Sequence, residues 1–514
     1  MNFNSSRASA LHSLPQSPLD VLIIGGGIVG AGIARDAALR GLKTGLIEQH
    51  DFAFGTSSRS SRLLHGGLRY LAQGRLGLVH EASVEKKTLH HIAPHLAEPL
   101  PFIFPAYRGN QNWQLWQLQI GVKLYDLLCG GRNLGRSSWM SAEVVMSRVP
   151  GLKADDLNGA VRYYDGFTND ARLTIDTLRS AAKHGAKLVN YCRFADATRA
   201  GLWECDVEDV LVGKRLKVKA RTVVNATGPW ADGLSHSAVK LRLTKGIHLV
   251  VERRRLPVPE TVVMTEGKRI LFAIPWGERT ILGTTDTDYA GSLDDVTADA
   301  TDIDYVLRIT NQFFPKAKLA VPDVVNAWAG LRPLLADPNG NPSDISRSHE
   351  IRRSEPGWWD VAGGKLTTYR LMAEQTVDQL VSALTKSQTP AVSLSACRTA
   401  KDRLLAPDEV QNLSGILPPE FCRRVVEHYC ANEWAVHLDD VMVRRTGWHY
   451  YHRDATAKAG HVAHWMAELL NWTSEQRAAE LARYLAMMHC QRTGDSSSSP
   501  TTPRQNDRQT LPMV

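Results

Sequence analysis

The pattern of apolar and polar positions near the N-terminus alternates between strand-like and helix-like segments. Residues 21–24 form a short apolar run rich in β-branched side chains, which is typical of a buried parallel strand. Apolar residues then recur at helical spacing over 31–40, Gly41 ends the predicted helix, and residues 44–47 form a second apolar run. This order predicts a strand–helix–strand unit of a parallel sheet.

A glycine-rich loop joins the first strand of this unit to its helix. Gly25, Gly27 and Gly30 have the spacing G-x-G-x-x-G, which allows a tight turn, close approach to a pyrophosphate and close helix–strand packing. Glu48 ends the second strand, where an acid suits a ribose hydroxyl and would repel a 2′-phosphate. The unit therefore predicts dinucleotide binding rather than a purely structural turn, but it does not by itself distinguish FAD from NAD.

Later segments favour FAD. The loop-rich segment 51–69 supplies hydroxyls and amides suited to phosphate and flavin polar groups, and an apolar strand ends at 225 in the turn 226–228. The segment GGKLTTYR, 363–370, opens a helix whose N–H groups and dipole would stabilise negative charge on a reduced flavin ring, which nicotinamide does not need. The expected cofactor-binding residues are Gly25, Gly27, Gly30, Glu48, Thr56, Ser57, Ser58, Thr227, Gly228, Gly364, Lys365, Leu366 and Thr367.

The remaining pattern divides the chain into domains. Short strand-like runs between 243 and 335 predict an antiparallel substrate domain, and helical apolar spacing over 420–489 predicts a separate helical domain. We expect a disordered leader, 1–18; a discontinuous nucleotide domain, about 19–100, 150–235 and 340–390; an interleaved cap domain, about 101–149 and 236–339; a C-terminal helical domain, 391–490; and a disordered tail, 491–514.

One predicted helix, 113–128, has an unusual apolar face. Trp113, Trp116, Ile120, Leu124 and Leu127 share that face, and its tryptophans would suit a membrane interface. The favoured interpretation is that this face covers the protein's own core, with the membrane as the alternative. No run of about 18 apolar residues exists, so no segment is predicted to span a bilayer.

Composition narrows the chemistry further. The 514 residues carry 61 basic and 53 acidic side chains, a formal charge of +8 that favours acidic ligands or anionic surfaces. The basic runs are short and scattered, which argues against nucleic-acid binding. The seven cysteines lack C-x-x-C spacing and the 18 histidines lack metal-ligand spacing, so we predict no metal. The serine-rich residues 1–18 favour a disordered leader over a transit peptide.

Several longer motifs, in order along the chain, resemble one family. They are GGGIVGAGIARDAALRG, TSSRSSRLLHGGLRYL, NDARL, VNATGPW, IPWGERTILGTTD, GLRPL and GGKLTTYR. Together they resemble the FAD-dependent, membrane-associated glycerol-3-phosphate dehydrogenases of the bacterial aerobic type. The resemblance implies an α/β fold with an FAD-binding Rossmann-like domain of the glutathione-reductase/D-amino-acid-oxidase type, an antiparallel-sheet substrate cap and a C-terminal helical domain. Asn169 departs from the acidic residue expected there.

The same resemblance implies an activity. The protein is expected to oxidise sn-glycerol 3-phosphate to dihydroxyacetone phosphate by hydride transfer to FAD and to pass electrons to a membrane quinone. It would act as a peripheral protein on the cytoplasmic face of the inner membrane, and the sequence leaves open whether it forms a homodimer. The alternatives are an oxidase that uses oxygen and a flavoprotein retained as a scaffold or regulator. An amine or amino-acid oxidase is less favoured because the chain offers an arginine-rich set for phosphate.

The chemistry assigns roles to particular side chains. His65 is the first choice for the base that takes the hydroxyl proton, because histidine titrates near neutrality, and a desolvated Lys365 is the alternative. Arginine forks bind phosphate at two points, and threonine hydroxyls would position the substrate. The expected catalytic residues are His65, Arg332 and Lys365, and the expected substrate-binding residues are Arg69, Tyr70, Thr284, Thr285, Arg332 and, less favoured, Arg370.

Overall fold

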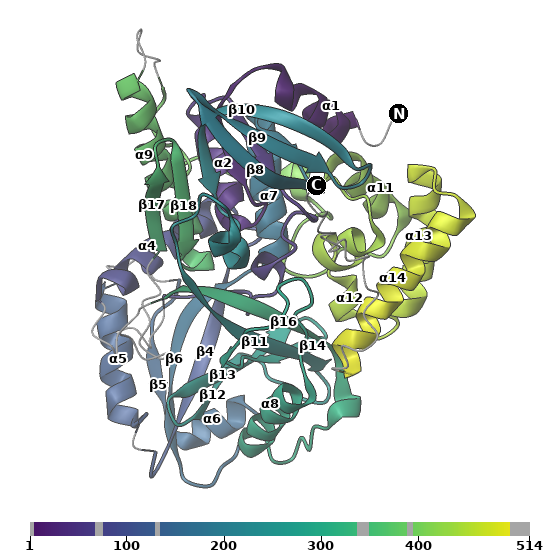
Figure 1. The fold of residues 1–514 in the computed structure, drawn as a ribbon. Coiled ribbons are helices and arrows are strands. Elements are labelled where there is room, and N and C mark those ends of the chain that lie inside the picture. The colour runs from purple at the N-terminus through teal and green to yellow at the C-terminus, as the bar shows by residue number, and fades with distance from the viewer. Residues whose placement is uncertain are drawn as a thin grey trace, which may run out of the picture.

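The computed structural model describes residues 5–66, 76–110, 112–128, 134–336, 349–387 and 394–493. Two sheets lie one above the other in Figure 1, and the C-terminal helices run along one side of both. The upper sheet belongs to the nucleotide domain and the lower sheet to the cap domain.

The nucleotide domain is built on an eight-stranded sheet. Five parallel strands form its centre in the order β18-β10-β1-β2-β7, with β17 antiparallel at one edge and β8 and β9 extending from β10 as a meander. The bounds are β1 (Leu19–Ile24), β2 (Thr44–Ile47), β7 (Lys187–Val189), β8 (Cys192–Ala200), β9 (Leu202–Asp209), β10 (Lys214–Asn225), β17 (His349–Glu355) and β18 (Trp358–Gly363). The predicted strand–helix–strand unit is confirmed.

Helices cover one face of this sheet and the meander covers the other. Helices α2 (Ile28–Leu39), α7 (Asp170–Lys183) and α9 (Tyr369–Ser387) pack together through buried side chains such as Ile33, Leu178 and Val377. On the opposite face Trp203 and Trp358 pack edge-on, with ring centroids 5.2 Å apart. The parallel strands are therefore buried on both faces, which explains their continuous apolar sequences.

Residues 5–16 of the predicted leader are folded, which corrects the expectation of disorder for this part of the segment. Helix α1 (Ser5–Ser13) and the short 3₁₀ helix Leu14–Gln16 pack on the nucleotide domain. Leu14 is fully buried, and Nη2 of Arg7 donates to Oδ1 of Asp209 at 2.7 Å. The composition of this segment suggested disorder. The segment is folded because it buries Leu14 and pairs Arg7 with Asp209 of the nucleotide domain.

The cap domain is built on a ten-stranded, mainly antiparallel sheet. The strands of this sheet are β3 (Leu63–Leu64), β4 (Glu98–Tyr107), β5 (Ser138–Met140), β6 (Leu157–Phe167), β11 (Leu241–Glu252), β12 (Thr261–Glu266), β13 (Arg269–Trp276), β14 (Arg279–Gly283), β15 (Thr287–Asp288) and β16 (Val324–Leu335). The helices of the domain are α4 (Leu76–Ile92), α5 (Leu115–Leu128), α6 (Ala142–Arg148) and α8 (Ala300–Phe313). Strand β6 pairs with β4 here, so the chain returns to the nucleotide domain only after residue 167 and not at 150 as expected.

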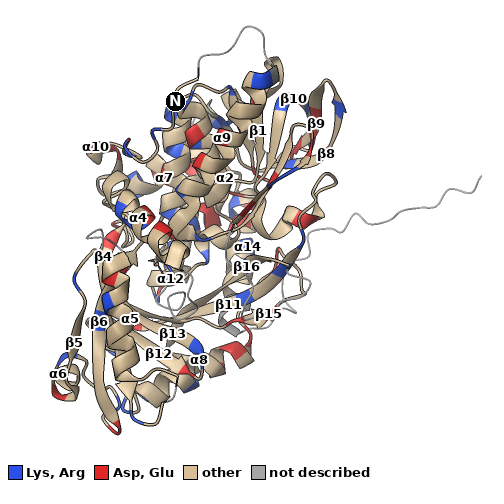
Figure 2. Cartoon of the chain, turned by 90° about the vertical axis from the view of Figure 1, so that its left-hand side faces the viewer, with Lys and Arg blue, Asp and Glu red and all other residues tan. Residues whose placement is uncertain are grey.

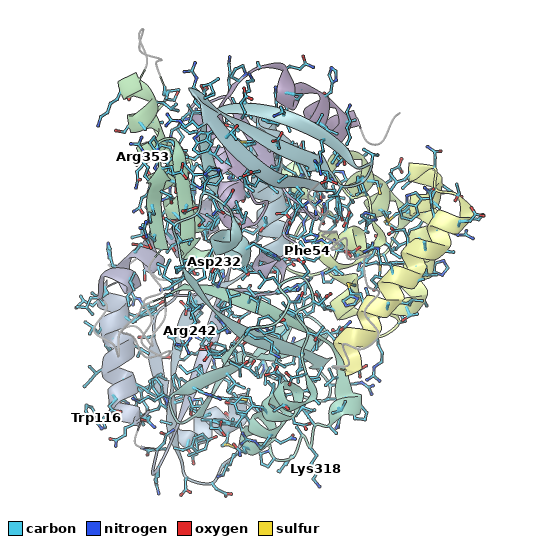
Figure 3. All side chains as sticks on the ribbon, viewed as in Figure 1. Phe54, Trp116, Asp232, Arg242, Lys318 and Arg353 are labelled. Carbon is cyan, nitrogen blue, oxygen red and sulfur yellow. The ribbon has the colours of Figure 1, made fainter. Side chains whose placement is uncertain are left out.

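Helix α5 turns its apolar face outward, which corrects the favoured interpretation. Trp116 is 57% exposed and Leu127 is 74% exposed, whereas Leu118, Val122 and Tyr125 face the core. Trp116 lies at the outer edge of the molecule in Figure 3, and α5 faces the viewer in Figure 2. The helix is apolar on two sides, and periodicity alone did not show which side is buried.

The C-terminal domain is helical, as predicted. It comprises α10 (Pro407–Val410), α11 (Arg423–Asn432), a π-helix η6 (Asp440–Arg445), α12 (Trp448–Tyr451), α13 (Ala455–Leu470) and α14 (Ser474–Thr493). Tyr429, Met442 and Trp448 form part of its own core. No helix in the described ranges is long and apolar enough to cross a bilayer. The predicted tail beyond 493 lies outside the described residues.

Candidate cofactor and substrate site

A cavity of about 690 Å³ lies at the carboxyl ends of the parallel strands, between the nucleotide and cap domains. Residues directly after β1, β2, β10 and β18 line it, because the carboxyl ends of parallel strands meet at one edge of the sheet. The cap contributes residues of β11 and β16 from the other side. The three contact segments predicted from the sequence therefore meet in one place.

The glycine loop between β1 and α2 requires glycine for two reasons. Gly25 has a φ of +111°, and a Cβ there would lie 2.6 Å from the carbonyl oxygen of Ala226. A Cβ at Gly30 would lie 2.0 Å from the carbonyl oxygen of Gly25. The loop thus brings β1, α2 and β10 into close contact and leaves the start of α2 beside the cavity, where backbone N–H groups favour a phosphate.

Glu48 lies in the cavity wall at the end of β2. Its Oε2 accepts a hydrogen bond from the backbone N–H of Gly26 at 2.7 Å, and its Oε1 accepts one from the backbone N–H of His50 at 2.8 Å. Burial raises the pKa of Glu48 above its ordinary value. A carboxylate has about four acceptor positions, so these two bonds orient Glu48 and leave capacity for ribose hydroxyls.

His248 on β11 also lines the cavity, and the sequence prediction missed it. Its imidazole stacks on the indole of Trp328, with ring centroids 5.1 Å apart and an interplanar angle of 20°. Its Nε2 lies 2.8 Å from Oγ of Ser61, while Nδ1 has no hydrogen-bond partner among the described residues. Burial, and then the charges of Arg332 and Arg62, lower the pKa of His248 to about 3. The ring is therefore neutral at pH 7.

The loop that carries Ser61 is held on both sides. Asp170, at the start of α7, accepts a hydrogen bond from the backbone N–H of Ser60 at 2.8 Å. Trp328 donates from Nε1 to the carbonyl oxygen of Ser60 at 3.1 Å. Asn169 precedes Asp170 and caps α7 by accepting from the N–H of Arg172 at 3.3 Å. Asparagine caps a helix as well as aspartate does, so the unexpected residue preserves this end of α7.

Arg332 on β16 presents a guanidinium to the cavity. Its Nη2 donates to Oγ1 of Thr284 at 3.0 Å and to the carbonyl oxygen of Thr285 at 3.2 Å, and its Nη1 donates to Oδ1 of Asp286 at 3.2 Å. A Cβ at Gly246 would lie 2.3 Å from Nη2, so glycine leaves the room in which the guanidinium crosses β11 in this position. The two threonines therefore orient Arg332 and are not themselves cavity-lining residues.

His65 and Lys365 both line the cavity from segments far apart in the sequence. The backbone N–H of His65 donates to Oγ1 of Thr367 at 3.0 Å, and the same hydroxyl donates to the carbonyl oxygen of His65 at 3.3 Å. These bonds join β3 to the 3₁₀ helix Leu366–Thr368. Both predicted candidates for the base are thus brought to one wall of the cavity.

The predicted site residues fall into three groups: those that line the cavity, those that lie outside its lining and those outside the described residues. The cavity is lined by Gly25, Gly27, Glu48, Thr56, Ser57, His65, Thr227, Gly228, Arg332, Gly364, Lys365, Leu366 and Thr367. Outside its lining lie Gly30, Ser58, Thr284, Thr285 and Arg370. Arg69 and Tyr70 fall outside the described residues.

Arg370 is not brought to the cavity, and its predicted contact with substrate is replaced by a structural one. Its Nε and Nη2 donate to the two carboxylate oxygens of Glu85 at 2.8 and 2.6 Å, and Nη1 donates to Glu374 at 2.6 Å. Arg370 and Glu85 are only 5% and 2% exposed. This buried pair joins α4 to α9 and uses the guanidinium fully.

The cavity suits a dinucleotide with a substrate beside it. Its volume of about 690 Å³ falls within the range of small-molecule sites. The N–H groups of the glycine loop suit a phosphate and the carboxylate of Glu48 suits a ribose. Nδ1 of His248, which has no hydrogen-bond partner among the described residues, is a buried polar atom that a ligand would pair. The residues present fit FAD.

Comparison with known proteins agrees with this geometry. The family model described as "FAD dependent oxidoreductase" matches residues 20–379, and the model described as "C-terminal domain of alpha-glycerophosphate oxidase" matches residues 398–477. A Bacillus halodurans structure described as glycerol-3-phosphate dehydrogenase complexed with FAD superposes with a TM-score of 0.76 at 28% identity, covering 96% of this chain and 99% of that one.

Two relatives show the family at the level of sequence. "Glycerol-3-phosphate dehydrogenase 2" of Mycobacterium tuberculosis (strain ATCC 25618 / H37Rv) is 34% identical over 539 residues, which span 95% of this chain and 91% of the relative. "Alpha-glycerophosphate oxidase" of Streptococcus pyogenes serotype M6 is 36% identical over 445 residues, which span 74% of this chain and 73% of the relative. The chain therefore belongs to the FAD-dependent oxidoreductase family that contains the glycerol-3-phosphate dehydrogenases and oxidases.

Proposed function

We propose that this protein oxidises sn-glycerol 3-phosphate to dihydroxyacetone phosphate. The observation that carries the proposal is the guanidinium of Arg332, which two threonine contacts hold in the wall of the cavity that also contains neutral His248. A fixed arginine fork suits a phosphate group, and a neutral imidazole suits a secondary alcohol that must lose a proton. The names of the two relatives, glycerol-3-phosphate dehydrogenase and alpha-glycerophosphate oxidase, support the same substrate.

The residues then have separate tasks. Arg332 binds the phosphate and so places the carbon chain between the two domains. His248 takes the hydroxyl proton, because Ser61 and Trp328 orient its imidazole in the cavity wall and the neutral ring carries one unprotonated nitrogen. FAD, when bound, supplies the acceptor for the hydrogen and electron pair that leave carbon 2. His65 and Lys365 are the other ionisable candidates for the proton, and variants at all three positions distinguish them.

We further propose that a quinone in the inner membrane is the electron acceptor and that the protein binds the cytoplasmic face of this membrane peripherally. The support is the outward face of α5, where Trp116, Ile120, Leu124 and Leu127 are exposed together. Lys123 on the same helix is exposed as well. Exposed apolar side chains beside a basic one suit a bilayer that contains anionic lipid.

An oxygen-consuming reaction is the second candidate. The match of residues 398–477 to a model named for an oxidase, and the relative named as an oxidase, favour it. An anaerobic titration with glycerol 3-phosphate, followed by quinone in one sample and oxygen in another, tests substrate and acceptor in turn. Bleaching of the flavin by substrate and fast recolouring by quinone are expected, with much slower recolouring and little peroxide in the oxygen sample. A flavin that substrate does not bleach would contradict the proposed activity and favour a non-catalytic scaffold.

A further inference from the structure

The segment 48–57 forms much of the cofactor side of the cavity. Glu48, Phe54, Gly55, Thr56 and Ser57 line it directly. Inside the segment, the N–H of residue 53 donates to the carbonyl oxygen of residue 26 in the glycine loop at 3.0 Å. The segment and the glycine loop therefore form one backbone-bonded unit around the expected position of the pyrophosphate and ribose.

The middle of this segment is bound by the C-terminal domain. Oδ2 of Asp51 accepts from Nε of Arg444 at 2.5 Å and from Nη1 of Arg445 at 2.6 Å. Oδ1 of Asp51 accepts from Nη2 of Arg445 at 2.8 Å and from Nδ2 of Asn190 at 3.1 Å. The side chains of Asp51 and Arg445 have no exposed surface, and that of Arg444 is only 3% exposed.

The two arginines are themselves held inside the C-terminal domain. They are consecutive residues at the end of the π-helix Asp440–Arg445. Arg444 also binds Asp439 and Asp440, at 2.6 and 2.5 Å, and Arg445 donates to the carbonyl oxygen of Glu433 at 2.7 Å. Burial alone would raise the pKa of Asp51, but the charges of Arg445 and Arg444 lower it below its ordinary value. Asp51 is therefore charged, and the pairing is ionic.

Aromatic contacts reinforce the same connection. Phe52 is fully buried and packs edge-on against Trp434 of the C-terminal domain, with centroids 5.3 Å apart. A Cβ at Gly26 would lie 2.5 Å from the Phe52 ring, so this ring presses on the glycine loop. Arg444 lies over the ring of Phe54 at 5.8 Å. Phe54 lies where the nucleotide domain, the cap and the C-terminal helices meet (Figure 3).

We propose that the C-terminal helical domain controls how tightly the protein holds FAD, through the pairing of Asp51 with Arg444 and Arg445. The pairing holds segment 48–57 against the glycine loop in the conformation that binds the dinucleotide. Asp51, Arg444 and Arg445 do not line the cavity, so they are positioning residues and not ligands of FAD. Because breaking a buried ion pair leaves an uncompensated charge, loss of the pairing loosens the segment.

The chain offers a matched control at the same domain boundary. Arg172 on α7 donates from Nη1 to Oε2 of Glu433 at 2.6 Å, and their side chains are 2% and 0% exposed. This pair also joins the nucleotide domain to the C-terminal domain. Arg172, however, is neither in segment 48–57 nor in the cavity wall. Glu433 also accepts from Arg445, but through its backbone carbonyl oxygen, and its carboxylate keeps Arg179 as a partner. Arg172→Gln therefore weakens the domain contact without removing a direct partner of Asp51.

The test measures FAD release from the purified holoenzyme, by the rise in flavin fluorescence after dilution, together with the thermal unfolding midpoint. Asp51→Asn and the milder Arg445→Lys are expected to release FAD about tenfold faster than the unchanged protein or more. Arg172→Gln is expected to lower the unfolding midpoint and to stay within about twofold of the original release rate. FAD release is measured at one temperature, well below the unfolding midpoint of every variant.

Two outcomes would overturn the proposal. The first is a release rate for Arg172→Gln that matches that of Asp51→Asn, because the effect would then follow domain stability in general. The second is an unchanged release rate for Arg445→Lys. If Asp51→Asn does not fold, Arg445→Lys decides the question, because it keeps the charge while it removes the two-point binding of Asp51 together with the bonds to the carbonyl oxygen of Glu433.

Discussion

The hydroxyl oxygen of Ser61 lies 2.8 Å from Nε2 of His248 and, with the stacked Trp328, fixes how the imidazole lies in the cavity wall. A proton acceptor that is already oriented and neutral does not have to reorganise as the alcohol loses its proton. Ser61 thereby connects the loop that follows the cavity-lining Thr56 and Ser57 to a strand of the cap.

His248→Asn is expected to slow the chemical step by a factor of about 100 to 10,000, because general-base catalysis contributes on that order. Stopped-flow bleaching of the flavin under anaerobic conditions measures this step directly, and bound FAD is quantified from its absorption. His65→Asn and Lys365→Met are the comparison variants. Normal bleaching by His248→Asn with slow bleaching by His65→Asn would restore His65 as the base.

The stability of the protein should depend on pH through His248. Its folded pKa of about 3 lies below the ordinary 6.5, so below pH 6.5 the unfolded chain binds a proton that the folded chain does not. His248 therefore makes its full contribution to the free energy of unfolding above pH 6.5. As the pH falls from 6.5 toward 3 this contribution is lost, at a limiting rate of about 1.4 kcal/mol per pH unit. Denaturant unfolding at several pH values should show a shallower loss for His248→Asn; parallel curves would contradict the assignment.

Arg332→Ala is expected to raise the Michaelis constant for glycerol 3-phosphate about 10- to 150-fold while FAD stays bound, because a charged hydrogen bond contributes about 1.5–3 kcal/mol. Arg332→Lys should recover only part of this loss, since lysine cannot bind at two points. The control is Arg242→Ala, which removes a partly exposed arginine on the neighbouring strand that is paired with Asp288. Steady-state kinetics with unchanged constants for Arg332→Ala would remove its proposed role.

Replacing the outward apolar face of α5 should weaken membrane binding. Trp116→Ser together with Leu127→Ser is expected to lower binding to vesicles of phosphatidylcholine and phosphatidylglycerol about tenfold or more, because burying one large apolar side chain contributes about 1.5–3 kcal/mol. Co-sedimentation measures the bound fraction. Val212→Ser is the control, since Val212 is 72% exposed on the β9–β10 turn. Equal losses in both proteins, or none in either, would exclude α5 as the contact.

Arg370→Gln is expected to affect stability and not substrate binding. Removing one partner of a buried ion pair costs about 3–5 kcal/mol, and Glu85 would be left with an unpaired buried charge. Chemical denaturation should show a loss of this order, while the Michaelis constant of the folded fraction stays unchanged. A raised Michaelis constant with normal stability would return Arg370 to the substrate site.

The N-terminal half of the cofactor site could be predicted because its determinants are local. The apolar run before Gly25, the helical spacing after it and the acid at Glu48 all lie within one strand–helix–strand unit. The more distant segments at Thr227 and Gly364 lie with it because they follow β10 and β18, which pair in parallel with the central strands, and such strands end at one edge of a sheet.

The sequence by itself thus determined the fold class, the order of elements in the nucleotide domain and the segments that meet around the cofactor. Only the tertiary structure decided that His248, in an apolar strand, faces the cavity, that Arg370 pairs with Glu85, and that Trp116 faces outward. The reason is physical: periodicity and turn chemistry act over a few residues, whereas burial and ion pairing depend on which distant surfaces come together. The contact of Asp51 with Arg445, 394 residues apart, is of this second kind.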